Sequence, residues 1–162
     1  MRARQLILVT GSGSGVGKTS LGTALVERLS RLGFRVGVVK HVHHGVDYRV
    51  KDTGRYLDAG ASRVAAIGPG EYMIVEKKLL GFWNAIDVVG DVDVVVVEGF
   101  KNHMGNVAGR GGCIVYVGRE DDKPPSPSSG KLIAINPAEI GEAVEALIRL
   151  IEEGKCVIST QH

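Results

Sequence analysis

A glycine-rich segment near the amino end of the chain constrains the fold more than any other feature. Residues 11–20 read GSGSGVGKTS, and a short apolar run, Leu6–Val9, comes directly before them. Glycines let a backbone fold round a phosphate with its N–H groups turned inward, and a following helix adds a partial positive charge. A strand, this loop and a helix in that order predict a Walker A phosphate loop, rather than a glycine-rich turn with a chance lysine.

Each side chain of this loop has an expected contact with a nucleotide. Lys18 is expected to reach the β- and γ-phosphates, the Thr19 hydroxyl to bind Mg²⁺, and Ser20 to touch the α-phosphate. Ser12 stands where the usual pattern has its first glycine, and a serine fits there if its φ angle stays negative. The expected nucleotide-binding residues are Ser12, Gly13, Ser14, Gly15, Val16, Gly17, Lys18, Thr19 and Ser20.

Apolar runs that alternate between strand and helix patterns predict the fold. A stripe of leucines predicts a helix from Lys18 to Leu32, and the β-branched run Asp93–Val97 predicts a central strand. We expect an α/β protein of the P-loop NTPase class, with one domain over residues 1–162 and a mostly parallel twisted sheet that carries helices on both faces. Further strands are expected at Arg35–Lys40, Arg63–Ile67, Tyr72–Val75, Ile114–Val117 and Leu132–Ile135, helices at Asp52–Ala59 and after Asn136, and loops at Lys101–Gly112 and Asp121–Gly130.

Composition and length limit the classes of function. A formal net charge of +2 over 162 residues gives no clustered basic face, so we expect no nucleic-acid partner. No apolar stretch reaches the roughly 18 residues of a membrane span, and the run after Arg4 ends too early for a signal peptide. We therefore expect a cytoplasmic protein. Cys113 and Cys156 have no CxxC spacing, and we expect two reduced thiols rather than a disulfide.

Two carboxylates are candidates for chemistry at the phosphates. Glu98 ends the strand Asp93–Val97, which is the Walker B arrangement, and from there a carboxylate can hold Mg²⁺ through water or orient an attacking water. A solvated glutamate at a strand end is the alternative. Asp52 either caps the helix that begins there or supplies a second carboxylate near the γ-phosphate, and its spacing leaves both interpretations open.

Basic side chains follow two of the expected strands. The run at residues 40–44 reads KHVHH, and the run at residues 100–103 reads FKNH. Since the carboxyl ends of parallel strands meet at one edge of a sheet, both runs are expected beside the phosphate loop. We interpret them first as contacts for a second anionic ligand or a partner, second as a solvated loop, and third as a zinc site. The residues concerned are Lys40, His41, His43, His44 and Lys101.

Taken in order, these motifs resemble the molybdopterin-guanine dinucleotide biosynthesis protein B (MobB) family. The resemblance spans about residues 6–117 and rests on the phosphate loop followed by KHxHH at 40–44, KDT at 51–53, AGA at 59–61 and VEGFK at 97–101. It implies a GTP-binding homodimer that is at most a slow GTPase. It also implies an accessory role beside the guanylyltransferase that joins GMP to molybdopterin.

The resemblance also assigns roles to individual residues. Thr19, Asp52 and Glu98 become Mg²⁺ or phosphate-site residues, with the two carboxylates as the catalytic pair. The KHxHH residues and Lys101 become candidates for the phosphate of molybdopterin or for the partner surface. No N-K-x-D guanine signature is present, so guanine preference is implied by the resemblance alone. Arg119, Asp121 and Asn136 are candidates for contact with the base, with solvated loop residues as the favoured alternative.

A different enzyme class remains as an alternative. The GVGKT core at residues 15–19 also suits an ATP-dependent ligase of the dethiobiotin-synthetase type. The KHxHH and EGFK runs are not the signature of that class. A small-molecule kinase usually needs an arginine-bearing lid over the phosphates, and residues 121–130 contain no arginine.

Overall fold

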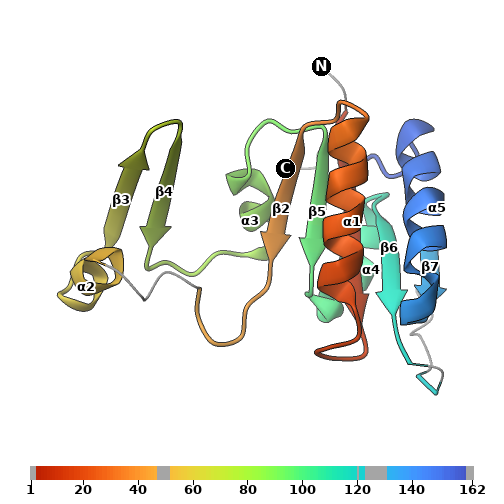
Figure 1. The fold of residues 1–162 in the computed structure, drawn as a ribbon, viewed down its shortest axis with the longest axis horizontal. Helices are drawn as coiled ribbons and strands as arrows, with labels where there is room; N and C mark the ends of the chain where they lie inside the picture. Colours follow the sequence, from red (N-terminus) through yellow and green to blue (C-terminus); the bar gives the residue numbers. More distant parts are fainter. Residues whose placement is uncertain (1–2, 47–51, 120, 123–130, 160–162) are drawn as a thin grey trace. The chain divides into compact units, whose positions relative to one another are not determined.

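The chain forms two compact units. Figure 1 shows the computed structural model, which describes residues 3–46, 52–119, 121–122 and 131–159. The sheet unit comprises Met1–His41 and Phe82–His162, and the hairpin unit comprises Val42–Gly81. Each unit is described by itself below. The expectation of a single domain stays a prediction, because compactness does not measure independent folding.

A parallel sheet organises the sheet unit. Its five strands lie in the order β2-β5-β1-β6-β7 and all run parallel. Strand β1 lies near the centre, where Ile7 pairs with Val96 on one side and with Cys113 on the other. This confirms the expected sheet. The strands are β1 Gln5–Gly11, β2 Val36–Lys40, β5 Val94–Glu98, β6 Cys113–Val117 and β7 Lys131–Ile135.

Helices cover both faces of this sheet, as expected, so each face has its own apolar core (Figure 1). Ile7 and Val9 pack into one core with leucines of α1 and α5, whereas Leu6 and Leu8 pack into the other with α3 and α4. Alternate residues of a strand point to opposite faces, which explains why β1 is apolar throughout. The helices are α1 Lys18–Arg31, α3 Phe82–Val88, α4 Met104–Gly109 and α5 Ile140–Glu152, with short 3₁₀ helices η1 Lys101–His103 and η2 Pro137–Glu139.

Side chains cap the entry to α5, where the sequence predicts a helix after Asn136. The Asn136 side chain accepts a hydrogen bond from the Ala138 N–H (2.9 Å), and the Glu139 carboxylate accepts one from the Asn136 N–H (2.7 Å). These two bonds form a capping box on η2, which leads directly into α5. Since its side-chain oxygen is used in this cap, Asn136 is positioned as a structural residue.

The segment Lys101–Gly112 is not the long loop that its glycines suggest. It contains η1 and α4, because Met104, Val107 and Ala108 fall on one side of a helical turn and are buried against the sheet. Gly105 and Gly109 lie on the exposed side, where a Cβ would meet nothing within 4 Å. Burial of the apolar stripe therefore outweighs the poor helix propensity of glycine.

Cys113 and Cys156 form a disulfide, so the expectation of two reduced thiols is wrong. Strand β1 brings the two residues together. The Leu6 N–H donates to the Cys156 carbonyl (3.0 Å), and Ile7 pairs with Cys113. Their Cα atoms are 5.1 Å apart, within the range that a disulfide spans, and both residues are fully buried. A separation of 43 residues left no spacing signal in the sequence.

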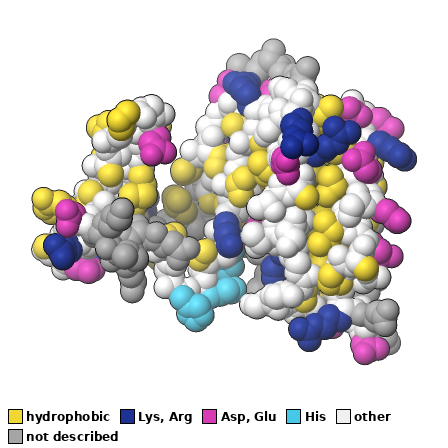
Figure 2. Space-filling view, viewed as in Figure 1, with side chains coloured by type: hydrophobic (Ala, Val, Ile, Leu, Met, Phe, Trp, Pro, Cys, Tyr) yellow, Lys and Arg dark blue, Asp and Glu magenta, His cyan; other side chains and the backbone are white. Residues whose placement is uncertain are grey.

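The hairpin unit is a two-stranded antiparallel sheet with one helix. Helix α2 (Asp52–Asp58) packs against β3 (Arg63–Gly68) through the fully buried Leu57, and β3 pairs with β4 (Glu71–Glu76). Figure 2 shows that hydrophobic side chains gather on the surface of this unit. Eight of the twelve exposed large apolar side chains in the described residues belong to it: Val46, Tyr56, Ile67, Tyr72, Met73, Ile74, Leu79 and Leu80.

The expectations about a membrane span and about the loop Asp121–Gly130 have different outcomes. No helix among residues 3–46, 52–119, 121–122 and 131–159 is both long and apolar enough to cross a bilayer. The expected exposed loop Asp121–Gly130 falls mostly on residues 123–130, which lie outside the described residues.

Candidate functional site

The phosphate loop joins β1 to α1 at the carboxyl edge of the sheet. Gly15 and Gly17 have φ angles of 72° and 100°, which favour glycine over residues with a side chain. Gly11 lies so close to the Val117 carbonyl of β6 that a Cβ would collide with it. Ser12 has no positive φ, as a serine in the first glycine position requires, and its N–H donates to the Val117 carbonyl (3.1 Å).

Three elements converge on the carboxylate of Glu98 at the end of β5. The Thr19 hydroxyl of α1 donates to Glu98 Oε1 (2.8 Å), and Lys40 Nζ at the end of β2 lies 3.9 Å from the same oxygen. The side chain of Glu98 is only 13% exposed. Sequence reasoning expected Thr19 and Glu98 to act together, and the fold places them in direct contact.

Lys18 is anchored within the loop. Its ammonium group donates to the Gly13 carbonyl (2.7 Å), at the opposite side of the turn. The lysine therefore already lies across the loop that its charge is expected to serve. A phosphate in the loop would offer this ammonium a charged acceptor, which makes a stronger hydrogen bond than a neutral carbonyl.

The donor atoms beside Lys18 suit a magnesium ion. Thr19 and Glu98 offer a hydroxyl and a carboxylate, and oxygen ligands of this kind are those that Mg²⁺ takes together with water and nucleotide phosphates. The third interpretation of the histidine run was a zinc site. Within the described part of the chain, no three His, Cys, Asp or Glu side chains lie close enough to hold a metal ion.

A hydrogen bond links the phosphate loop to the segment that follows β6. The Ser12 hydroxyl is bonded to the Asp122 carboxylate and is the main reason that the pKa of Asp122 lies below its ordinary value. The Arg119 N–H adds a second hydrogen bond (2.6 Å), and the charge of Lys101 acts in the same direction. Sequence reasoning had named Asp121 and missed Asp122, because nothing in the spacing separates the two neighbours.

The basic residues are divided between the two units. Lys40, His41 and Lys101 lie at the carboxyl edge of the sheet, where they were expected. The Lys101 ammonium lies 5.7 Å from the centre of the Tyr116 ring. His43, His44 and Asp52 belong to the hairpin unit instead, and Asp52 is the first residue of α2, where it accepts a hydrogen bond from Arg55 (3.3 Å). Their proposed place beside the phosphates stays a prediction.

An aromatic cluster, which sequence reasoning missed, supports the turn after Glu98. The His41 ring stacks on Phe100 with 4.6 Å between ring centres, and Phe82 contacts Phe100 edge-on at 5.1 Å. Phe100 has a φ of 49°, the only positive value of a non-glycine residue in the described chain. A strained backbone persists only where its surroundings hold it, and these two ring contacts do so. The cluster thus joins the ends of β2 and β5.

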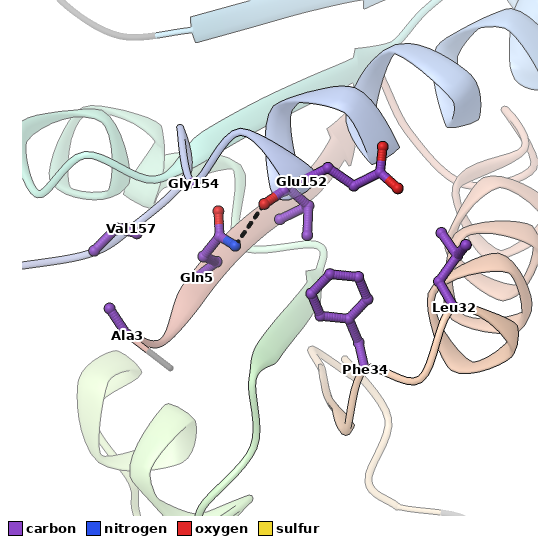
Figure 3. Close-up of a pocket in the computed structure, with 8 residues that line it drawn as sticks. Ala3, Gln5, Leu32, Phe34, Glu152, Gly154 and Val157 are labelled. Atoms are coloured by element: carbon purple, nitrogen blue, oxygen red, sulfur yellow. Dashed lines mark hydrogen bonds between the residues drawn. The ribbon is translucent and has the colours of Figure 1, made fainter. Parts of the chain in front are cut away.

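A hollow on the sheet unit lies at the other end of β1. It has a volume of about 600 Å³ and is lined by Ala3, Gln5, Leu32, Phe34, Ile151, Glu152, Gly154 and Val157 (Figure 3). The Gln5 amide donates to the Ile151 carbonyl (2.9 Å) and accepts from the Cys156 N–H (3.2 Å), so its hydrogen bonds are internal. Ligands of open parallel sheets bind at the carboxyl ends of the strands, so this hollow is not the nucleotide site.

Fold and site together define the class of protein. A parallel sheet, a glycine-rich loop between its strand β1 and helix α1, and an acid at the end of the neighbouring strand β5 make a P-loop NTPase fold. The solved structure of MobB from Bacillus subtilis shares this fold, with a TM-score of 0.62 over 97% of this chain and 99% of that one, at 18% identity.

Sequence comparison then gives the family. The model of the family "Molybdopterin guanine dinucleotide synthesis protein B" matches residues 6–107, and the chain therefore belongs to the MobB family. Over 104 residues it is 32% identical to the molybdopterin-guanine dinucleotide biosynthesis adapter protein of Escherichia coli and 35% identical to that of Haemophilus influenzae. Each alignment covers 59% of this chain, and the chain spans 59% and 57% of these relatives.

Proposed function

We propose that this protein is a GTP-binding adapter in the biosynthesis of molybdopterin guanine dinucleotide. It assists a guanylyltransferase, hydrolyses GTP slowly at most, and acts as a homodimer. Membership of the MobB family and the adapter names of the two relatives support the pathway. The observation that carries nucleotide binding is the contact between Thr19 of α1 and Glu98 of β5 beside the Lys18 loop.

In this proposal the residues of the sheet unit bind and orient the nucleotide. The loop N–H groups and Lys18 bind the phosphates, and Thr19 and Glu98 hold Mg²⁺. When bound, Mg²⁺ neutralises negative charge that develops on the phosphates. Lys40, which lies 3.9 Å from Glu98, keeps a positive charge at the same edge.

Lys40, His41 and Lys101 remain candidates for a second anionic ligand, such as the phosphate of molybdopterin, or for the guanylyltransferase. Their place at the sheet edge that carries the phosphate loop supports this role. His43 and His44 stay candidates for the same ligand or partner, and Asp52 stays a candidate for binding Mg²⁺ and for catalysis at the phosphates. We also propose a cytoplasmic location. The Cys113–Cys156 disulfide is unusual there, although its full burial keeps attacking thiols away from it.

A nucleotide titration tests this proposal against the ATP-dependent ligase of the dethiobiotin-synthetase type. The purified protein is titrated calorimetrically with GTP and with ATP, each with and without Mg²⁺. We expect GTP to bind at least about tenfold more tightly than ATP, a difference of about 1.4 kcal/mol. We also expect GTP to reach its full affinity only when Mg²⁺ is present. Tight ATP binding without GTP preference would overturn the assignment. Failure to associate with a molybdenum-cofactor guanylyltransferase would overturn the adapter role separately.

A further inference from the structure

A lysine of the neighbouring strand faces the carboxylate of Glu98. Lys40 ends β2 and is the register partner of Glu98 at the end of β5, and paired residues of neighbouring strands point to the same face of a sheet (Figure 1). The His41 N–H donates to the Glu98 carbonyl (3.0 Å), which extends the pairing one residue beyond β2. Among the described residues, no other lysine or arginine forms an ion pair with Glu98. The register of the sheet therefore brings Lys40 to this carboxylate.

The contact between Lys40 and Glu98 is one of charge without a hydrogen bond. Lys40 Nζ lies 3.9 Å from Glu98 Oε1, beyond hydrogen-bond distance, and the Thr19 hydroxyl donates to that same oxygen at 2.8 Å. The side chain of Lys40 is 52% exposed, whereas that of Glu98 is 13% exposed. A carboxylate with so little access to water needs a neighbouring positive charge. Here a loosely held ammonium supplies that charge.

The lysine of the phosphate loop has a different position. Lys18 Nζ donates to the Gly13 carbonyl (2.7 Å), and within the described part of the chain no ion pair joins it to Glu98. The two lysines are thus divided between the two halves of the site. Lys18 lies across the loop that is proposed to bind the phosphates, and Lys40 neutralises the carboxylate that is proposed to hold the metal.

We propose that Lys40 takes the place of Mg²⁺ beside Glu98 when the metal is absent, and so limits how strongly nucleotide binding depends on Mg²⁺. Glu98 and Thr19 offer oxygens that fit Mg²⁺, and Glu98 is neutralised by the metal once it is bound. Because two cations beside one carboxylate repel each other, Lys40 and Mg²⁺ compete for Glu98. Lys40 acts through Glu98 and is therefore a positioning residue. This inference rests on the nucleotide and Mg²⁺ binding of the proposed function.

The charge balance at Glu98 predicts a selective effect of Lys40. Without Mg²⁺, a Lys40→Met variant has an uncompensated carboxylate beside the phosphates of the nucleotide, and these like charges repel. With Mg²⁺, Glu98 is neutralised in the variant and in the parent alike. Loss of the ammonium should therefore weaken metal-free binding far more than binding with Mg²⁺. By linkage, Mg²⁺ should raise the nucleotide affinity of the variant by a larger factor than that of the parent.

Calorimetric titration of the full chain with GTP, in saturating Mg²⁺ and in EDTA, measures this selectivity. Lys40→Met should lose at least about tenfold in metal-free affinity, and its affinity in Mg²⁺ should change by less than about threefold. Lys40→Arg keeps the charge and should bind as the parent does in EDTA. Lys78→Met, at an exposed lysine of the hairpin unit, is the control and should match the parent in both conditions. An equal loss with and without Mg²⁺ would overturn the proposal, as would a parent with no measurable affinity in EDTA.

A direct contact between Lys40 and the phosphates would give a similar loss, and a double-mutant comparison separates the two explanations. Glu98→Gln removes the charge that Lys40 neutralises. In that background, Lys40→Met should change the metal-free affinity by less than about threefold. A loss that persists in full without the charge of Glu98 would contradict the proposal. Thermal melting checks that each variant is folded.

A titration with metal alone separates this proposal from the proposed function. Mn²⁺, which takes similar oxygen ligands and is followed by electron paramagnetic resonance, is added to the nucleotide-free protein. Lys40→Met should bind Mn²⁺ at least about threefold more tightly than the parent, because the competing ammonium is gone. The same Mn²⁺ affinity in both proteins, or none in either, would refute the competition. Absence of GTP binding in the parent would instead refute the proposed function and leave the Mn²⁺ result standing.

Discussion

The two sheets of this molecule bury their side chains in opposite ways. In the sheet unit every residue of β1 is buried, because helices cover both faces, whereas in the hairpin unit α2 packs against β3 and large apolar side chains of β3 and β4 stay exposed. The first unit therefore holds a two-sided core of its own, whereas the second exposes apolar side chains to solvent. The predicted site residues are also divided between the two units. The phosphate loop and Glu98 belong to the first unit, and Asp52, His43 and His44 belong to the second.

The largest effect expected from this comparison concerns stability. Leu25 is fully buried in the sheet unit, and Leu79 of the hairpin unit is 99% exposed. Leu25→Ala should lower the free energy of unfolding by about 3–5 kcal/mol, because it leaves a cavity in a packed core. Leu79→Ala removes the same atoms and should change that free energy by about 0.5 kcal/mol or less. Urea unfolding, followed by the fluorescence of Trp83, measures both free energies of unfolding. Equal losses in the two variants would contradict the comparison.

The next effect concerns nucleotide affinity. Lys18→Ala removes the ammonium that lies across the phosphate loop, and GTP affinity should fall at least about 100-fold, or about 2.7 kcal/mol, while the melting temperature stays close to that of the parent. Lys78→Ala is the matched control, since Lys78 is exposed in the hairpin unit. Its affinity should equal that of the parent. Calorimetric titration gives both values, and an unchanged affinity for Lys18→Ala would refute the phosphate-loop assignment.

Features that depend on short stretches of sequence could be predicted. The strand before the phosphate loop, the acid at the end of β5 and the helix after Asn136 each need only a few neighbouring residues. The contact between Thr19 and Glu98 followed from the rule that parallel strands end at one edge. Local patterns therefore gave the fold class and the centre of the candidate site.

Features that depend on distant residues could not be predicted. The Cys113–Cys156 disulfide needs β1 to bring two segments together, and the hydrogen bond from Ser12 to Asp122 needs the segment after β6 to reach the phosphate loop. Helix α4 forms in a glycine-rich stretch because the sheet offers a surface for Met104 and Val107. In each case tertiary contacts, which no local pattern encodes, decide the outcome.

The smallest effect tests the link between Ser12 and Asp122. Hydrogen bonds from the Ser12 hydroxyl and the Arg119 N–H lower the pKa of Asp122 in the folded protein, so this carboxylate stabilises the fold above its unfolded-state pKa of about 3.9. That stabilisation is lost as the pH falls through the lower folded-state pKa. Asp122→Asn should therefore lower the melting temperature by about 2 °C or less at neutral pH. The difference from the parent should shrink below about pH 4, where the parent loses the same interaction.

Asp121→Asn, at the exposed neighbour, is the control and should follow the parent at every pH. A difference that persists unchanged in acid would show that Asp122 acts through its shape and not through its charge, and the phosphate loop would then lack an electrostatic tether to the segment after β6.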